Sequence, residues 1–158
     1  MKEYSHETDF THDIIIIGGG TAGLTLAEGA SRLGLKTILL EKGKTGGSCL
    51  FNGCIPFKNL ISLSAMYSTA VNSENYGISL FNTPKPDFKS VVDSINFIIE
   101  KNMLFDSEER LKNMGAEVLH CCPVFLNSRQ IDTGLGQILS AEKIIISTGS
   151  CPDIPVIN

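Results

Sequence analysis

The first part of the chain alternates aliphatic runs with a segment of helical periodicity. Residues 13–17 read Asp-Ile-Ile-Ile-Ile, which predicts a strand buried on both faces. Residues 21–33 carry apolar side chains near helical spacing, and residues 36–41 predict a second strand. Strand, helix and strand within about 30 residues predict a right-handed βαβ unit, from which parallel sheets are built.

Two longer amphipathic helices are predicted in the middle of the chain. A glycine-rich loop at residues 42–52 leads to a helix that begins near Ile55, with Pro56 in its first turn, where a missing N–H costs nothing. Pro84 and Pro86 then precede another helix. The apolar face of the first helix is expected at Leu60, Leu63, Tyr67 and Val71, and that of the second at Phe88, Val91, Val92, Ile95, Ile98 and Ile99.

The last part of the chain changes to short strands. Asp106 with Glu109 predicts a capping box for a short helix, which Gly115 ends. Strands follow at residues 116–120, 123–127, 129–133, 137–140 and 143–147. The predicted fold class is therefore α/β, a Rossmann-like domain with a central parallel sheet and a small antiparallel β-meander. Its expected boundaries are a polar tail at residues 1–12, the domain at 13–150 and the start of a linker at 151–158, marked by Pro152 and Pro155.

Composition and charge narrow the function classes. The chain has 158 residues, 42% apolar and 19% charged, as expected for one globular domain. Its net charge of −4 supplies no basic surface for nucleic acid. The polar first twelve residues do not resemble a signal peptide, and the run at 14–17 is too short for a bilayer, so the default expectation is a cytoplasmic protein without membrane contact.

A glycine-rich motif joins the first strand to the first helix. The pattern is Gly18-x-Gly20-x-x-Gly23, with Thr21 and Ala22 inside it. Its glycines allow a tight turn, close approach of a pyrophosphate and close helix–strand packing. Glu41 closes the second strand, where a carboxylate can accept hydrogen bonds from ribose hydroxyls. The motif predicts nucleotide binding without separating NAD from FAD, and a purely structural turn is the alternative.

A cysteine pair carries the second chemical signal. Cys49 and Cys54 lie between glycines and at the start of a predicted helix, whose dipole and free N–H groups would lower the pKa of Cys54. The pair can serve as a redox disulfide. One alternative is two cysteines of structural role. Another is a zinc site that adds His120 and Cys122.

The order of GGGTAG, Glu41, GGSCLFNGCIPFK and IIISTGS resembles the class I pyridine nucleotide-disulfide oxidoreductases, which include dihydrolipoamide dehydrogenase, glutathione reductase and mercuric reductase. The resemblance implies FAD as the nucleotide, Cys54 as the thiol facing the flavin and Cys49 as the interchange thiol. Lys58 matches the lysine near the flavin N5. The other residues implied at the cofactor are Gly18, Gly20, Thr21, Ala22, Gly23, Glu41, Lys42, Gly46, Gly47, Ser48, Pro123, Thr148 and Gly149. No metal ligand is implied.

The resemblance also carries departures from the family pattern. Ser48 replaces a threonine, and the family's Leu-Asn-Val-Gly-Cys is replaced by residues 50–54, Leu-Phe-Asn-Gly-Cys. Cys121-Cys122-Pro123 stands where a glycine-containing strand usually presents its backbone to adenine, and the proline removes an N–H. Both cysteines, like Cys151, are expected to be incidental. Residues 105–110 look most like the mercuric reductase branch.

By this resemblance the complete enzyme adds a nicotinamide-binding domain and a dimerisation domain, and it acts as a homodimer. None of His6, His12 and His120 matches the family's catalytic histidine. The expected function is transfer of electrons from NAD(P)H through FAD to the Cys49–Cys54 disulfide, and from there to a small disulfide such as lipoamide or to a metal ion such as Hg(II). The alternative is an inactive FAD-binding remnant or interaction module, and the chain by itself is expected not to turn over.

Overall fold

The chain divides into two compact units. A computed structural model describes residues 9–80, 82, 85–105, 107–151 and 153–157. The first unit is formed by residues 1–47 and 106–158, and the second by residues 48–105. Two predicted features, the tail at residues 1–8 and the prolines at 84 and 152, lie outside the described residues.

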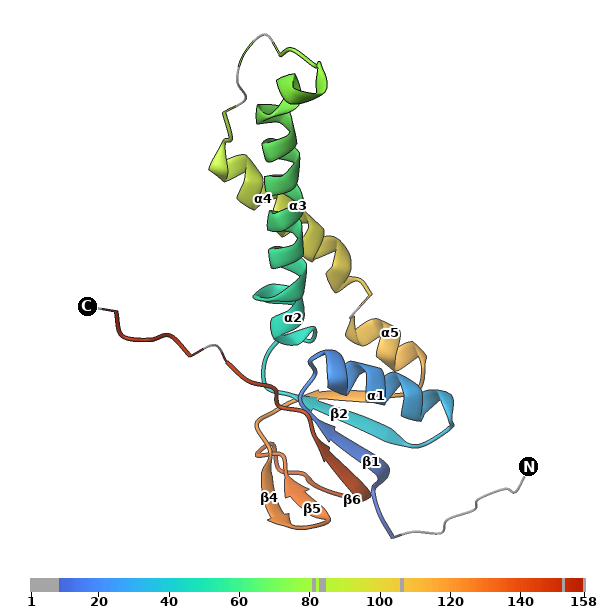
Figure 1. Cartoon of the computed structure of the whole chain (residues 1–158). Helices are drawn as coiled ribbons and strands as arrows, with labels where there is room; N and C mark the ends of the chain where they lie inside the picture. The colour runs from blue at the N-terminus through green and yellow to red at the C-terminus, as the bar shows by residue number, and fades with distance from the viewer. Residues whose placement is uncertain (1–8, 81, 83–84, 106, 152, 158) are drawn as a thin grey trace. The chain divides into compact units, whose positions relative to one another are not determined.

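The first unit is built on a six-stranded sheet with the strand order β3-β2-β1-β6-β5-β4 (Figure 1). Strands β3, β2, β1 and β6 run parallel, whereas β4 and β5 form an antiparallel extension. The strands are His12–Ile17, Thr37–Glu41, Glu117–His120, Val124–Asn127, Gln130–Asp132 and Ile138–Ile146, for β1 to β6 in order. The predicted α/β class, with a parallel sheet and a β-meander, is confirmed.

Strand β6 is one continuous strand where the sequence predicted two. Its residues 138–140 pair antiparallel with β5, and its residues 143–146 pair parallel with β1. The polar residues between the two predicted strands do not break β6, because their backbone and side-chain groups form hydrogen bonds. Ser140 exchanges hydrogen bonds with Thr11, and the Ala141 N–H donates to the Arg129 carbonyl oxygen at 3.1 Å.

Two hydrophobic clusters occupy the two faces of this sheet. Because strand side chains alternate, Ile15 and Ile17 belong to one cluster and Ile16 to the other. The cluster of Ile16 is completed by helix α1, Thr21–Arg32, and by Leu111 of helix α5, Glu108–Asn113. Helix α5 begins at a different cap from the one predicted: Asp106 lies outside the described residues, and the Ser107 side chain accepts a hydrogen bond from the Arg110 N–H at 3.3 Å.

The second unit is mainly helical. Helix α3, Cys54–Val71, packs against helix α4, Phe88–Met103, with the short 3-10 helix η1, Ser73–Tyr76, between them in sequence. The predicted start near Ile55 is confirmed to within a residue, and α4 begins at Phe88, the first residue of its predicted apolar face. The predicted loop at 42–52 is wrong over its second half, because helix α2 occupies Gly47–Phe51. In the part of the chain that the structure describes, each helix is too short or too polar to cross a bilayer.

Candidate nucleotide site and dithiol

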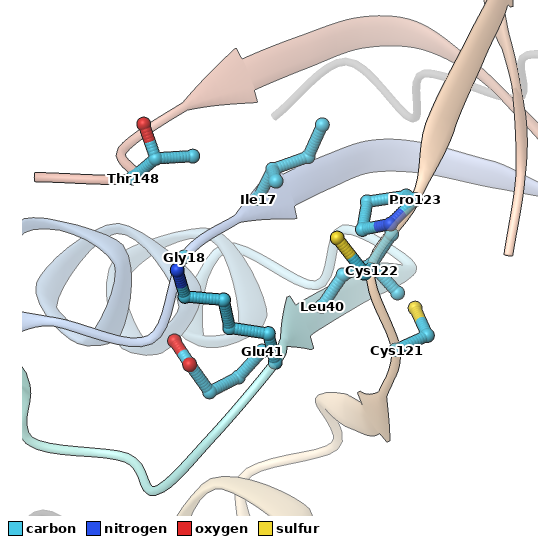
Figure 2. A pocket seen from close by; sticks show the side chains of 9 residues that line it. Ile17, Gly18, Leu40, Glu41, Cys121, Cys122, Pro123 and Thr148 are labelled. Carbon is cyan, nitrogen blue, oxygen red and sulfur yellow. The ribbon is translucent and has the colours of Figure 1, made fainter.

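The carboxyl ends of the four parallel strands meet at one edge of the sheet, where a cavity of about 230 Å³ opens. In doubly wound folds this is the edge at which ligands bind. The lining residues come from the ends of β1, β2, β3 and β6 and from the segments that follow these strands (Figure 2). They are Ile17, Gly18, Leu40, Glu41, Lys42, Cys121, Cys122, Pro123 and Thr148. Gly18, Glu41, Lys42, Pro123 and Thr148 were among the residues that the sequence placed at the cofactor.

Two glycines of the motif are required by the geometry of the turn. Gly18 has a φ of +104°, and a Cβ there would lie 2.4 Å from the Ser147 carbonyl oxygen. A Cβ on Gly23 would lie 1.8 Å from the Gly18 carbonyl oxygen. A side chain at either position would therefore push the start of α1 away from the sheet. This close packing holds the beginning of the helix against the end of β1.

The amino terminus of α1 is arranged to receive an anion. Its N-cap is Gly20, no side chain caps it, and its first turn has no acidic residue. A Cβ at Gly20 would meet only the Gly47 Cα, at 3.8 Å, so the space beside the turn is open. The N–H groups that begin the helix at Thr21 and Ala22 therefore have no side-chain acceptor at the cap. Free N–H groups and the helix dipole together favour a phosphate at such a terminus.

The Glu41 carboxylate is held at the cavity by the backbone. One of its oxygens accepts a hydrogen bond from the Gly19 N–H at 2.5 Å, and the other accepts from the Gly43 N–H at 2.7 Å. These two bonds fix the side chain beside the glycine turn, with lone pairs remaining on each oxygen. A carboxylate fixed in this way can accept hydrogen bonds from ribose hydroxyls, as the sequence predicted.

A serine that the sequence did not single out supports the same turn. The Ser147 hydroxyl lies within hydrogen-bond distance of the carbonyl oxygens of Ile17, at 3.0 Å, and Gly18, at 2.9 Å. Its backbone N–H donates to the Ile17 carbonyl oxygen at 2.8 Å. It immediately precedes Thr148 and Gly149, and Gly149 has a φ of +70°. The position of Ser147 at the end of a strand parallel to β1 is the signal that could have identified it.

The predicted glycines at 46 and 47 pack against the turn from the other side. The Gly46 N–H donates to the Gly19 carbonyl oxygen at 2.8 Å. Gly47 has a φ of +64°, and a Cβ there would lie 2.7 Å from the Gly20 Cα. The segment after β2 is therefore shaped to lie directly along the glycine turn.

The segment after β3 supplies two cysteines to the cavity. The Cys121 N–H donates to the Glu41 carbonyl oxygen at 3.0 Å, and its side chain belongs to a hydrophobic core cluster. Burial raises the pKa of the Cys121 thiol above its usual value, and the charge of Cys122 adds to the effect. The Cys122 side chain is exposed. The sequence treated both cysteines as incidental, although the carboxyl end of β3 predicts their place at this edge.

The predicted redox cysteines lie in the second unit, on two consecutive helices. Cys49 is in α2 and is half-buried, whereas Cys54 begins α3 and is exposed. The two cysteines are not joined by a disulfide in this structure. Between them, a Cβ on Gly53 would lie 3.0 Å from the Ser48 carbonyl oxygen, so a side chain there would crowd the turn that joins the two helices.

The side chains of this pair interact directly. A hydrogen bond with Cys49, followed by the charge of Cys49, raises the pKa of Cys54, while the charge of Lys58 acts in the opposite direction. The sequence predicted that the helix terminus lowers the pKa of Cys54, and for the dithiol state this direction is wrong. Two thiols in contact resist carrying a negative charge each, so the pKa of Cys54 is raised. Ser48, Cys49, Cys54 and Lys58 belong to the second unit, and the remaining predicted site residues belong to the first.

The zinc alternative finds no support in the arrangement of possible ligands. Within residues 9–157, apart from the few positions not described, no three or more His, Cys, Asp or Glu side chains gather as a metal ion would require. His120, one of the supposed ligands, instead hydrogen-bonds to the Glu108 carboxylate at 2.6 Å.

The fold and the site geometry agree with comparisons to known proteins. The chain belongs to the pyridine nucleotide-disulphide oxidoreductase family, whose family model matches residues 12–158. The resemblance inferred from the motifs is thereby confirmed.

Three similar proteins are named dihydrolipoyl dehydrogenase. The one from Bacillus subtilis is 30% identical over 151 residues, covering 89% of this chain and 32% of that protein. The mitochondrial one from Schizosaccharomyces pombe is 34% identical, covering 88% and 28%. The one from Rhizobium etli is 36% identical, covering 90% and 33%. The chain thus spans about a third of the length of these relatives.

Proposed function

We propose that this chain is the FAD-binding N-terminal part of a flavoprotein disulfide oxidoreductase, with Cys49 and Cys54 as its redox centre. The observation that carries the proposal is the coincidence of an uncapped helix terminus, a glycine turn and a fixed carboxylate at one cavity, in a chain that also holds a hydrogen-bonded dithiol. Family membership favours this combination over a nucleotide site of another kind.

The nucleotide half of FAD fits the residues at the sheet edge. The start of α1, at Gly20, Thr21 and Ala22, would hold the pyrophosphate with backbone N–H groups. Glu41 would accept the ribose hydroxyls. Lys42, Pro123 and Thr148 would complete the walls, with Gly46, Gly47 and Gly149 allowing the backbone to pass close to the cofactor. At Pro123 the adenine would meet a backbone position without an N–H donor.

The dithiol would carry out thiol–disulfide exchange. When bound, the flavin supplies two-electron transfer from NAD(P)H to the Cys49–Cys54 disulfide. The Cys49 thiolate then attacks a small disulfide R–S–S–R, forming a mixed disulfide and releasing RS⁻. The Cys54 thiolate attacks the Cys49 sulfur, restores the Cys49–Cys54 disulfide and releases the second RS⁻. The Cys49 thiol raises the pKa of Cys54, and once the Cys49 sulfur is held in the mixed disulfide the Lys58 charge, which acts in the opposite direction, favours the second thiolate.

The name that the relatives share supports a choice of substrate class. It favours a lipoamide-type disulfide over a glutathione-like disulfide or Hg(II). The resemblance to the mercuric reductase branch rests on the sequence of residues 105–110 alone. A homodimer and a cytoplasmic location remain parts of the proposal.

The test is the visible absorption spectrum of the purified chain mixed with FAD, before and after mild thiol reduction. We expect a bound-flavin spectrum that gains a long-wavelength shoulder when Cys54 becomes a thiolate beside the ring. Cys54→Ser should bind FAD without the shoulder, and Cys49→Ser should show it without reduction. The exposed Cys151→Ser is the control and should behave as the parent.

The outcomes separate the parts of this proposal. A flavin spectrum without the shoulder would contradict the roles given to the two thiols. Failure to bind either FAD or ADP would contradict the nucleotide site itself, and would favour an interaction module that has lost the cofactor.

A further inference from the structure

The cavity has a reactive group in its wall that the proposed electron transfer does not use. Cys122 follows β3 and lines the space together with Glu41, Lys42 and Thr148. Its thiol is exposed, whereas the adjacent Cys121 thiol lies in the hydrophobic core. Figure 2 draws both cysteines among the side chains that line the cavity, at the segment that follows β3.

The two neighbouring thiols differ in what they can do. An exposed thiol in the wall of a cavity is accessible to a soft partner from solution. The Cys121 side chain is buried in the core, and this burial raises the pKa of its thiol, so Cys121 is the less reactive of the two. A group attached to Cys122 is therefore removed mainly by a thiol from solution.

The size of the cavity makes the attachment consequential. About 230 Å³ is below the roughly 300–1,000 Å³ of typical ligand pockets. In so small a space, a group on one wall reduces the volume that is left for a ligand. A substituent on the Cys122 sulfur would occupy the place where a nucleoside must lie beside Glu41.

We propose that Cys122 is a thiol-modification site at which a mixed disulfide with a small thiol of the glutathione class excludes the nucleotide from the cavity. The Cys122 thiolate attacks a small disulfide R–S–S–R, one S–S bond forms as the other breaks, and RS⁻ leaves with the electron pair. The small disulfide is the oxidant, and a free thiol reverses the step. The proposal rests on the nucleotide site proposed above, and it makes loading of the apoprotein sensitive to the thiol redox state.

The test uses the 158-residue chain with Cys49→Ser and Cys54→Ser, so that the redox pair does not react. Oxidised glutathione is the probe, peptide mass spectrometry measures the adduct at each cysteine, and calorimetry measures ADP binding before and after treatment. Cys122→Ser is the test variant, and Cys151→Ser, which removes an exposed thiol that does not line the cavity, is the matched control.

We expect an adduct at Cys122 that lowers ADP affinity by at least about tenfold and is reversed by a thiol reductant. Oxidised glutathione should lower the ADP affinity of Cys151→Ser as much as that of the parent chain. It should leave the ADP affinity of Cys122→Ser unchanged. ADP added first should protect Cys122 but not Cys151. Equal ADP affinity with and without the Cys122 adduct, or no adduct at Cys122 while Cys151 reacts, would overturn the inference. Loss of ADP binding by the untreated chain would instead contradict the nucleotide site.

Discussion

The Ser147 hydroxyl lies 2.9 Å from the carbonyl oxygen of Gly18, 129 residues away in the sequence. It also lies 3.0 Å from the Ile17 carbonyl oxygen. One side chain at the end of β6 therefore satisfies the backbone at the beginning of the glycine turn. The turn is held by this serine from one side and by the Gly46 N–H from the other.

Replacing this hydroxyl should destabilise the first unit moderately. Ser147→Ala leaves two partly buried carbonyl groups without their side-chain donor, which costs about 1 kcal/mol. In a chain of this size the melting temperature should fall by about 2–4 °C. Calorimetry would measure the shift, and Ser150→Ala, at an exposed neighbouring position, should leave it unchanged. Equal shifts for both variants would contradict a specific role for Ser147.

Two glycines of α1 should respond to alanine in opposite directions. Gly23→Ala places a Cβ 1.8 Å from the Gly18 carbonyl oxygen, so the turn must move, at a cost of about 1–3 kcal/mol. Gly29→Ala meets nothing within 4 Å and should stabilise the helix by up to about 1 kcal/mol. Urea unfolding measures both. ADP binding should be lost in Gly23→Ala only, and retention there would show that the turn does not hold the nucleotide.

Removing the charge at Glu41 should weaken nucleotide binding. Glu41→Gln keeps the shape but replaces the carboxylate with a neutral amide, so only one of the Gly19 and Gly43 N–H groups can donate to an oxygen, and the other faces an NH2 donor. Hydrogen bonds to a charged group contribute about 1.5–3 kcal/mol, so ADP affinity should fall roughly 10–100-fold. Glu142→Gln, which removes an exposed carboxylate beside Lys143, is the control and should bind ADP normally.

The stability of the chain should fall as His12 is forced to take up a proton. Burial lowers the pKa of His12 below its ordinary value of 6.5, against the opposing effect of Glu117 and with a smaller lowering by Lys36. Because the unfolded chain then binds the proton more readily, the contribution to stability is present above pH 6.5 and is lost as the pH falls below it.

The measurement is urea unfolding across that range of pH. The free energy of unfolding of the parent should decline by at most about 1.4 kcal/mol per pH unit through this one group. His12→Asn should have a flatter profile, whatever its stability at neutral pH. A slope unchanged by His12→Asn would refute this origin.

The strongest local patterns predicted the central part of the fold. The aliphatic run before the glycine motif and the periodicity after it placed β1 and α1 correctly, because a doubly buried strand and an amphipathic helix each leave a distinct pattern. The continuity of β6 was missed because its pairing changes partner at Ala141, and hydrogen bonding to a partner strand is not visible in hydrophobicity. Helix α2 was missed because five residues rich in small side chains resemble a loop.

The candidate site could be predicted where a motif spans contiguous residues. Gly18, Glu41 and Thr148 were found from their motifs, and all line the cavity. Ser147 was not singled out and Cys122 was expected to be incidental, because their place at the cavity comes from the strands that precede them ending at one edge of the sheet. The pKa direction of Cys54 was also wrong, since its largest cause is a thiol on another helix.

The change of partner within β6 gives the first unit a cooperative character. One strand provides both the last parallel pair and the first antiparallel pair, so opening of either part of the sheet disturbs a strand that the other part uses. The meander therefore acts as a clamp on the strand that carries Ser147 and Thr148. Amide hydrogen exchange in β5 and β6 should report one shared opening event, and a nucleotide bound at the edge of the sheet should slow exchange as far away as the meander.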